Sequence, residues 1–217
     1  PGNVILSMLG ILQSNNLDYV YGRSAKTGVD AEAAARMLIP DEPSFSVGED
    51  PLAFTLDKKI VLPIVLAKKQ VMLQSGCCDP LVFIQDESLA LRLSLVAKRM
   101  AIVEHPCRYV LVSEEEEKTK KVASHHLSAN LNQQHHDQFL TYVHLLDGAE
   151  LSVEQRRKIA KKAFSPWWKS SRIGGFKARV FALYIMSKIF PVFVFDRFRR
   201  ELEEYFYRLP NVRRVGR

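Results

Sequence analysis

A glycine turn and an acid at a helix N-terminus fall within one continuous segment, residues 75–93. Gly76 follows an apolar run, a setting in which a residue without a Cβ can adopt positive φ or let a ligand approach the backbone. Asp86 opens an amphipathic stretch, where a carboxylate accepts hydrogen bonds from first-turn amides and is stabilised as the anion. The segment therefore predicts an ionised, fixed carboxylate beside a glycine turn. Acid–base chemistry and a simple helix cap both remain open for it.

Four of the six histidines fall within a polar stretch, residues 124–139, with Asn130, Gln133 and Asp137 between them. A run this polar needs water or a polar ligand. An imidazole is a common ligand for borderline metals, and a neighbouring carboxylate can fix its tautomer. A surface helix rich in His and Gln is the alternative for each of these histidines.

Helix and strand patterns lie on both sides of the first segment. Residues 4–12 show helical spacing and predict a helix that ends at Asn15 and Asn16. Residues 17–21 alternate and predict a strand that ends at Gly22, followed by a polar loop. Further predictions are a helix over 31–38, a turn-rich stretch over 41–51, an apolar run over 60–73, and strands over 101–103 and 109–112 separated by a bend at His105-Pro106.

The first segment resembles the second half of a family-2 glycosyltransferase with the GT-A fold. The resemblance rests on Gly76-Cys77-Cys78-Asp79, then Gln85-Asp86, then Leu89 to Leu93 with Arg92. Such enzymes carry a glycine turn that contacts donor or acceptor, followed by a Glu-Asp pair that opens a helix with a Leu-Arg-Leu segment. Here Gln85 replaces the first acid, and Asp86 keeps the second, which is the general base of the family.

The polar stretch resembles the helix that follows in bacterial members of that family. The matching residues are Leu127, Ser128, Asn130, His136 and Asp137. In the wider GT-A fold, a histidine of the C-terminal part can complete a metal shell. The resemblance therefore makes His136 the first candidate ligand, and His126 the second, for a divalent cation, Mg²⁺ or Mn²⁺.

The resemblance implies an α/β protein with a partial GT-A fold. Residues 1–150 would form a transferase domain without its nucleotide-binding half, and residues 151–217 a basic, partly apolar helical tail. The implied activity is inverting transfer of a sugar from a nucleotide-diphosphate donor to a hydroxyl of a lipid or glycan acceptor, as in polysaccharide biosynthesis. Asp86 would be the general base and would line the main cleft. The substrate-binding candidates are Gly76, Asp79, Gln85, Arg92, Asn130 and Gln133.

The family's metal-binding Asp-x-Asp motif does not occur in this sequence. If the resemblance holds, that motif would precede Pro1. We therefore expect these 217 residues to be a fragment that is inactive alone.

Composition favours an ordinary globular protein, with 47% hydrophobic and 25% charged residues. The formal charge of +7 favours an anionic partner. Three cysteines fit neither a zinc site nor an even disulfide framework, which predicts a reducing, cytoplasmic location. A hydrolase elbow of the GxSxG type and a GxGxxG loop are both absent.

The tail is basic and then apolar. The apolar stretch 180–195 is interrupted by Lys188 and Pro191 and is too short to span a bilayer. With the arginines and aromatic residues that follow, it fits an interfacial anchor. The sequence therefore predicts peripheral contact of residues 180–207 with the inner face of the membrane, and a core helix packed on the domain is the alternative.

A competing hypothesis is a non-catalytic basic module that binds a membrane surface or nucleic acid. Its support is the net charge, the Trp167-Trp168 pair and the basic residues around Arg156. The enzyme hypothesis is preferred, and nucleic acid is the less favoured partner under it.

Overall fold

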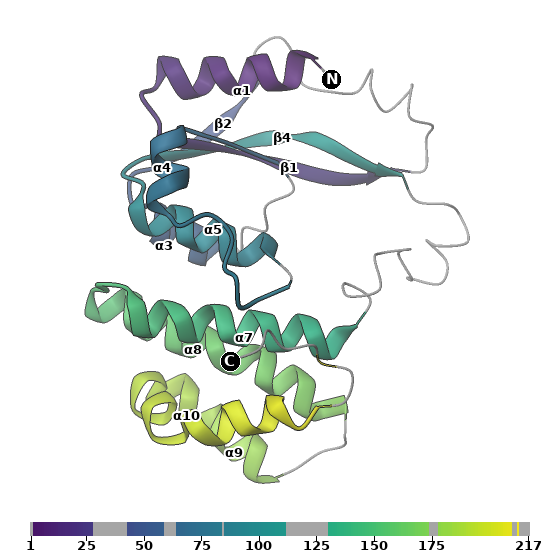
Figure 1. Cartoon of the computed structure of the whole chain (residues 1–217), viewed down its shortest axis with the longest axis vertical. Coiled ribbons are helices and arrows are strands. Elements are labelled where there is room, and N and C mark those ends of the chain that lie inside the picture. The colour runs from purple at the N-terminus through teal and green to yellow at the C-terminus, as the bar shows by residue number, and fades with distance from the viewer. Residues whose placement is uncertain are drawn as a thin grey trace. The chain divides into compact units, whose positions relative to one another are not determined.

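The computed structural model describes residues 2–27, 43–58, 64–83, 85–111, 130–173, 178–209 and 212 (Figure 1). The chain divides into two compact units. The first comprises Pro1–Cys77 and Leu89–Ala123, and the second comprises Cys78–Ser88 and Ser124–Arg217. A small mixed sheet and a larger number of helices confirm the predicted α/β class. The predicted domain boundary at residue 150 falls between two helices of the second unit.

The first unit is built on a four-stranded sheet with the order β2-β4-β1-β3. The two central strands, β1 (Tyr19–Thr27) and β4 (Met100–Leu111), are parallel. The edge strands, β2 (Phe45–Gly48) and β3 (Ile64–Ala67), are antiparallel to their neighbours. The sheet is therefore mixed, with its parallel pair in the middle.

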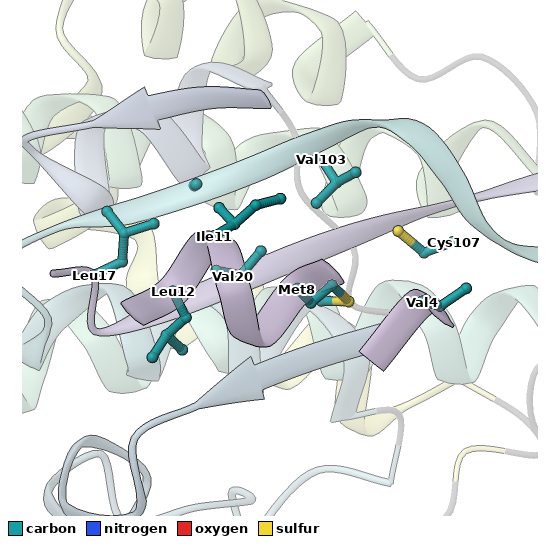
Figure 2. Close-up of a cluster of buried hydrophobic side chains, with 9 residues drawn as sticks. Val4, Met8, Ile11, Leu12, Leu17, Val20, Val103 and Cys107 are labelled. Carbon is teal, nitrogen blue, oxygen red and sulfur yellow. The ribbon is translucent and has the colours of Figure 1, made fainter. Parts of the chain in front are cut away.

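Helix α1 (Gly2–Ser14) covers one face of this sheet (Figure 2). Its helical spacing places apolar side chains on one side, where they pack against alternate residues of the central strands. Asn16 adopts φ 47°, a left-handed conformation that suits the end of a helix. The predicted helix and its end are confirmed. The residues that form this cluster are Val4, Met8, Ile11, Leu12, Leu17, Val20, Ala101, Val103 and Cys107.

The other alternate residues of the strands pack with α4 (Lys69–Gln74) and α5 (Gln85–Val96). Helix α3 (Pro51–Lys58) contributes Phe54 at the edge of this cluster. The sheet thus lies between two helical layers. The buried members of the second cluster are Tyr19, Tyr21, Val71, Ala90, Leu93, Ala97, Met100 and Ile102.

The prediction that the first strand ends at Gly22 is wrong, because β1 continues to Thr27 alongside β4. The two predicted strands over 101–112 are one strand, and the expected bend is an irregularity inside it. The register shifts between Gly22 and Arg23 and again between Arg23 and Ser24, so that Arg23 lies opposite Pro106. Such a shift accommodates a proline, which has no backbone N–H for the ladder.

The sequence predicts a helix and a turn-rich stretch for the segment between β1 and α3. The turn-rich stretch over 41–51 contains strand β2 and the first residue of α3. The predicted helix over 31–38 lies outside the described residues.

Asp18 connects several segments of the first unit. Its carboxylate accepts hydrogen bonds from the backbone N–H of Lys98 at 2.7 Å and of Arg99 at 3.3 Å, and it pairs with Lys68 Nζ at 3.2 Å. Burial alone would raise the pKa of Asp18, but these donors outweigh it and lower the pKa. One carboxylate therefore joins the start of β1 to the turns before β4 and α4.

The second unit consists mainly of α7 (Leu131–Gly148), α8 (Val153–Ile173), α9 (Ala178–Ile189) and α10 (Pro191–Tyr207). Aromatic side chains fill its interior, where Phe139 stacks on Phe206 with ring centroids 4.8 Å apart. Phe164 meets Phe195 edge to face. Among the helices that the structure describes, none is both long and apolar enough to cross a membrane.

Gly22 is required by the close approach of β1 to Cys107. A Cβ on Gly22 would lie 2.6 Å from Cys107 Cβ and 2.7 Å from its Sγ, whereas a Cβ on Gly10, in α1, would meet nothing within 4 Å. We expect Gly22→Ala to lower the free energy of unfolding by about 1–3 kcal/mol. Gly10→Ala should raise it by about 0.5–1 kcal/mol, because alanine favours a helix. Urea titration measures both. Equal effects in the two variants would contradict the proposed steric cause.

Candidate functional site

The first turn of α5 carries the candidate base. Gln85, Asp86 and Glu87 occupy this turn, where the helix dipole favours negative charge. The Asp86 side chain is exposed, whereas Gln85 and Glu87 are half-buried. No hydrogen bond or ion pair joins the Asp86 carboxylate to another described residue. The acid is therefore accessible to a ligand, and its position depends on its two neighbours.

Gln85 closes the loop that precedes α5. Its Oε1 accepts from the backbone N–H of Asp79 at 2.9 Å, and its Nε2 donates to the carbonyl of Asp79 at 2.7 Å. The same Nε2 also donates to the carbonyl of Val82. An ionised glutamate could accept but not donate, so it could not make this set of bonds. The structure thus gives a physical reason for an amide where the resemblance expects an acid.

Glu87, the residue after Asp86, is bonded to α7. Its carboxylate accepts from Gln138 Nε2 at 2.5 Å and from the hydroxyl of Tyr142, both on α7. Burial raises the pKa of Tyr142, and the charge and hydrogen bond of Glu87 raise it further. The tyrosine therefore stays a hydrogen-bond donor, and the first turn of α5 is bound to α7 by two side chains.

Asp79 is buried, with only 3% of its surface exposed. Its Oδ1 accepts from the backbone N–H of Leu81 at 2.9 Å, and its Oδ2 lies 2.7 Å from His144 Nδ1. A short-range bond of this kind to a residue two positions later stabilises a turn. In the structure Asp79 holds the loop to α7, and its predicted contact with substrate remains a prediction.

The polar residues at the start of α7 face inward. Asn130 caps the helix, because its Oδ1 accepts from the backbone N–H groups of Asn132 at 3.1 Å and Gln133 at 3.2 Å. Asp137 Oδ1 accepts from Gln133 Nε2 at 2.7 Å and lies 2.8 Å from His136 Nδ1. Its Oδ2 accepts from the backbone N–H of Phe83 at 3.1 Å. The buried carboxylate is thereby paired on both oxygens.

His136 is buried, with 2% of its surface exposed. Its Nε2 atom is buried too and has no hydrogen-bond partner among the described residues. The ring lies edge to face with Phe206, with centroids 6.2 Å apart, and 6.5 Å from the ring of Tyr207. Since Nδ1 is engaged by Asp137, only Nε2 could bind a metal. The second candidate, His126, lies outside the described residues.

The glycine turn belongs to the first unit and is tied to α5. Gly76 adopts φ 70° and Cys77 adopts φ 55°. Arg92 Nε donates to the carbonyls of Ser75 at 3.1 Å and Cys77 at 3.2 Å. A Cβ on Gly76 would lie 2.5 Å from Arg92 Nη2, so both the φ angle and the space call for glycine. Arg92, a predicted substrate contact, supports the turn in the structure.

The structure thus connects the predicted residues in two groups. Gly76 and Arg92 contact each other in the first unit, and Gln85 contacts Asp79 in the second. Within the described ranges, no three His, Cys, Asp or Glu side chains gather into a group that could hold a metal ion. The predicted roles of Asp86, Asn130, Gln133 and His136 in chemistry or binding remain predictions.

The residues that anchor this segment could not be recognised in the sequence. They are Glu87, Gln138, Tyr142 and His144. Gln138 and Tyr142 stand four residues apart on α7, which places them on one helix face, but nothing local identifies Glu87 as their partner. A family-model scan found no match for this chain, and a search of curated proteins also found none.

The Tyr142 hydroxyl should contribute to stability through Glu87. We expect Tyr142→Phe to lower the free energy of unfolding by about 1–3 kcal/mol at neutral pH, because the half-buried carboxylate loses a donor. Tyr184→Phe is the control, because no hydrogen bond joins the Tyr184 hydroxyl to another described residue. Similar losses in both variants would show that the hydroxyl of Tyr142 has no particular role.

The same variant has a characteristic pH dependence. An unfolded tyrosine ionises near pH ~10. The pKa of folded Tyr142 is raised, so its contribution to stability is present below that pH and is lost as the pH rises above it. The difference in unfolding free energy between wild type and Tyr142→Phe should therefore narrow above pH ~10. A constant difference from neutral to alkaline pH would contradict this account.

Proposed function

We propose that this chain is the acceptor-side part of a nucleotide-sugar transferase of the GT-A type, with Asp86 as its general base. The observation that carries the proposal is the contrast within one helical turn. Gln85 and Glu87 are each held by hydrogen bonds, while Asp86 between them is exposed. The bonds of its two neighbours hold this turn, and the exposed Asp86 side chain remains accessible to a substrate, as a general base requires.

One further feature supports the proposal. The helix that carries Asp86 also carries Arg92, whose Nε donates to the carbonyls of Ser75 and Cys77 on either side of Gly76. Gly76 itself adopts a positive φ, as expected for the glycine turn of the resemblance.

In the proposed reaction, Asp86 removes the proton of an acceptor hydroxyl as the oxygen attacks the anomeric carbon of the donor sugar. The bond from that carbon to the diphosphate breaks, and the nucleoside diphosphate departs with the bonding electrons. Attack from the face opposite the leaving group inverts the anomeric configuration. One carboxylate in the site suffices for this role, because no covalent sugar intermediate forms.

A divalent cation belongs to the proposal, and it would stabilise the charge of the departing diphosphate. His136 Nε2 fits one requirement of a ligand, because it is a buried nitrogen without a hydrogen-bond partner among the described residues. Asp137 would fix its tautomer through Nδ1, at 2.8 Å. The remaining ligands would come from an Asp-x-Asp motif, which this sequence does not contain.

The base can be tested by Asp86→Asn in a protein that joins this chain to a nucleotide-binding half. We expect turnover to fall by roughly 10²–10⁴-fold with donor affinity largely unchanged. Release of the nucleoside diphosphate from a panel of sugar donors measures turnover, and calorimetry measures donor binding.

The matched control is Glu154→Gln. Glu154 is also an exposed acid in the first turn of a helix, α8, so it reproduces the loss of a charge at a helix N-terminus. Its turnover should equal that of the wild type. Unchanged turnover in Asp86→Asn would remove Asp86 from the mechanism.

A further inference from the structure

Helix α9 presents its large apolar side chains to solvent. Phe181, Ile185 and Ile189, spaced four residues apart, have exposed fractions of 42%, 43% and 58%. The buried positions of the same helix hold Leu183 and the small polar Ser187. A helix that packs only on its own protein shows the opposite pattern, with its apolar stripe turned inward. The outward apolar stripe of α9 therefore indicates that this helix also contacts something other than its own protein.

The exposed stripe continues into the start of α10. Six of the fourteen strongly exposed large hydrophobic residues in the described part of the chain fall within positions 181–193. Such a concentration marks an interaction site, whereas scattered exposed residues do not. We define the α9 apolar surface by Phe181, Ile185, Met186, Ile189, Phe190 and Phe193.

Basic residues outnumber acidic ones in the half of the chain that carries this surface. Residues 124–217 contain 17 Lys and Arg against 8 Asp and Glu, whereas residues 1–123 contain 14 against 16. Within α9 itself, Lys188 Nζ lies 4.3 Å from the centre of the Tyr184 ring. Arg197 and Arg200 are exposed on α10, beyond Phe193. The excess basic charge of the chain thus lies in the half that carries the apolar surface.

Aromatic side chains lie behind the exposed stripe. Trp168 stacks on Tyr184 with ring centroids 4.8 Å apart, and it lies 5.7 Å from the ring of Phe181. Both Trp168 and Tyr184 are half-buried. Trp and Tyr are enriched at the level where lipid headgroups meet acyl chains, because one end of each ring is apolar and the other is polar.

We propose that the α9 apolar surface binds an anionic lipid bilayer, with α9 lying in the plane of the interface. The 12-residue helix is about 18 Å long, too short for a hydrocarbon core of about 30 Å. An in-plane helix instead inserts one apolar face and keeps cations at the headgroups. The flanking Lys188, Arg197 and Arg200 favour anionic lipid over a neutral surface.

The test is co-sedimentation of the full chain with lipid vesicles. Vesicles of phosphatidylcholine with roughly 30% phosphatidylglycerol should bind the chain, and vesicles of phosphatidylcholine alone should bind it more weakly. Added salt should weaken binding to the anionic vesicles, because it screens the basic residues. No binding to the anionic vesicles would overturn the proposal.

Two variants identify the surface. Ile185→Glu and Phe190→Glu each replace an exposed apolar side chain with a charge, and each should lower vesicle partitioning by about tenfold or more. The control Val153→Glu makes the same kind of change at a residue that is 87% exposed on α8, and it should bind as the wild type does. Circular dichroism checks that all three variants remain folded. Equal losses of vesicle binding in all three variants, or no loss in any of them, would refute this assignment of the surface.

Trp168 gives an independent measurement. The chain has two tryptophans, and Trp167 is only 3% exposed. Brominated lipid should quench the wild-type fluorescence, and Trp168→Phe should remove most of this quenching. A second copy of the chain is the other occupant to consider. Sedimentation equilibrium that shows a dimer dissociated by Ile185→Glu, with no lipid quenching of the wild type, would assign the surface to self-association and overturn the proposal.

Discussion

The structure around the candidate base depends on the pairing of carboxylates that are wholly or partly buried. A buried charge without a partner is so unfavourable that a buried carboxylate must be paired. The residues that pair with it therefore hold the surrounding chain in place. Asp79 and Asp137 are buried, and Glu87 is half-buried. All three take their partners from the loop before α5 and from α7. Residues 79–87 are consequently bound to α7 at three points, and the exposed Asp86 takes its position from its neighbours.

This arrangement also explains the use of amides and tyrosine. Asp137 and Glu87 need donors, and Gln133, Gln138 and Tyr142 supply them without adding positive charge. An arginine or lysine at these positions would neutralise the acids but would also alter the field at Asp86. Neutral donors leave the negative charge of the acids in the first turn of α5 uncompensated, which is compatible with the general-base role proposed for Asp86.

Some of the fold could be predicted from the sequence because the signals are local. The spacing of α1 and the acidic start of α5 depend on neighbouring residues, and both predictions agree with the structure. The extension of β1 past Gly22 could not be predicted, because its residues are polar and their pairing with β4 is distant in sequence. The burial of His136 could not be predicted either, because a polar stretch can be buried when its side chains hydrogen-bond to one another.

Burial divides the three cysteines by reactivity, because Cys107 packs tightly against β1 at Gly22. Burial raises the pKa of the Cys107 thiol, so it is a poor nucleophile at neutral pH. Cys78 is exposed, and Cys77, beside Gly76, is half-buried. A thiol reagent would therefore modify the turn before α5 and leave the sheet intact. The chain thus contains a natural labelling position in the turn before α5, where a probe can be attached without a substitution.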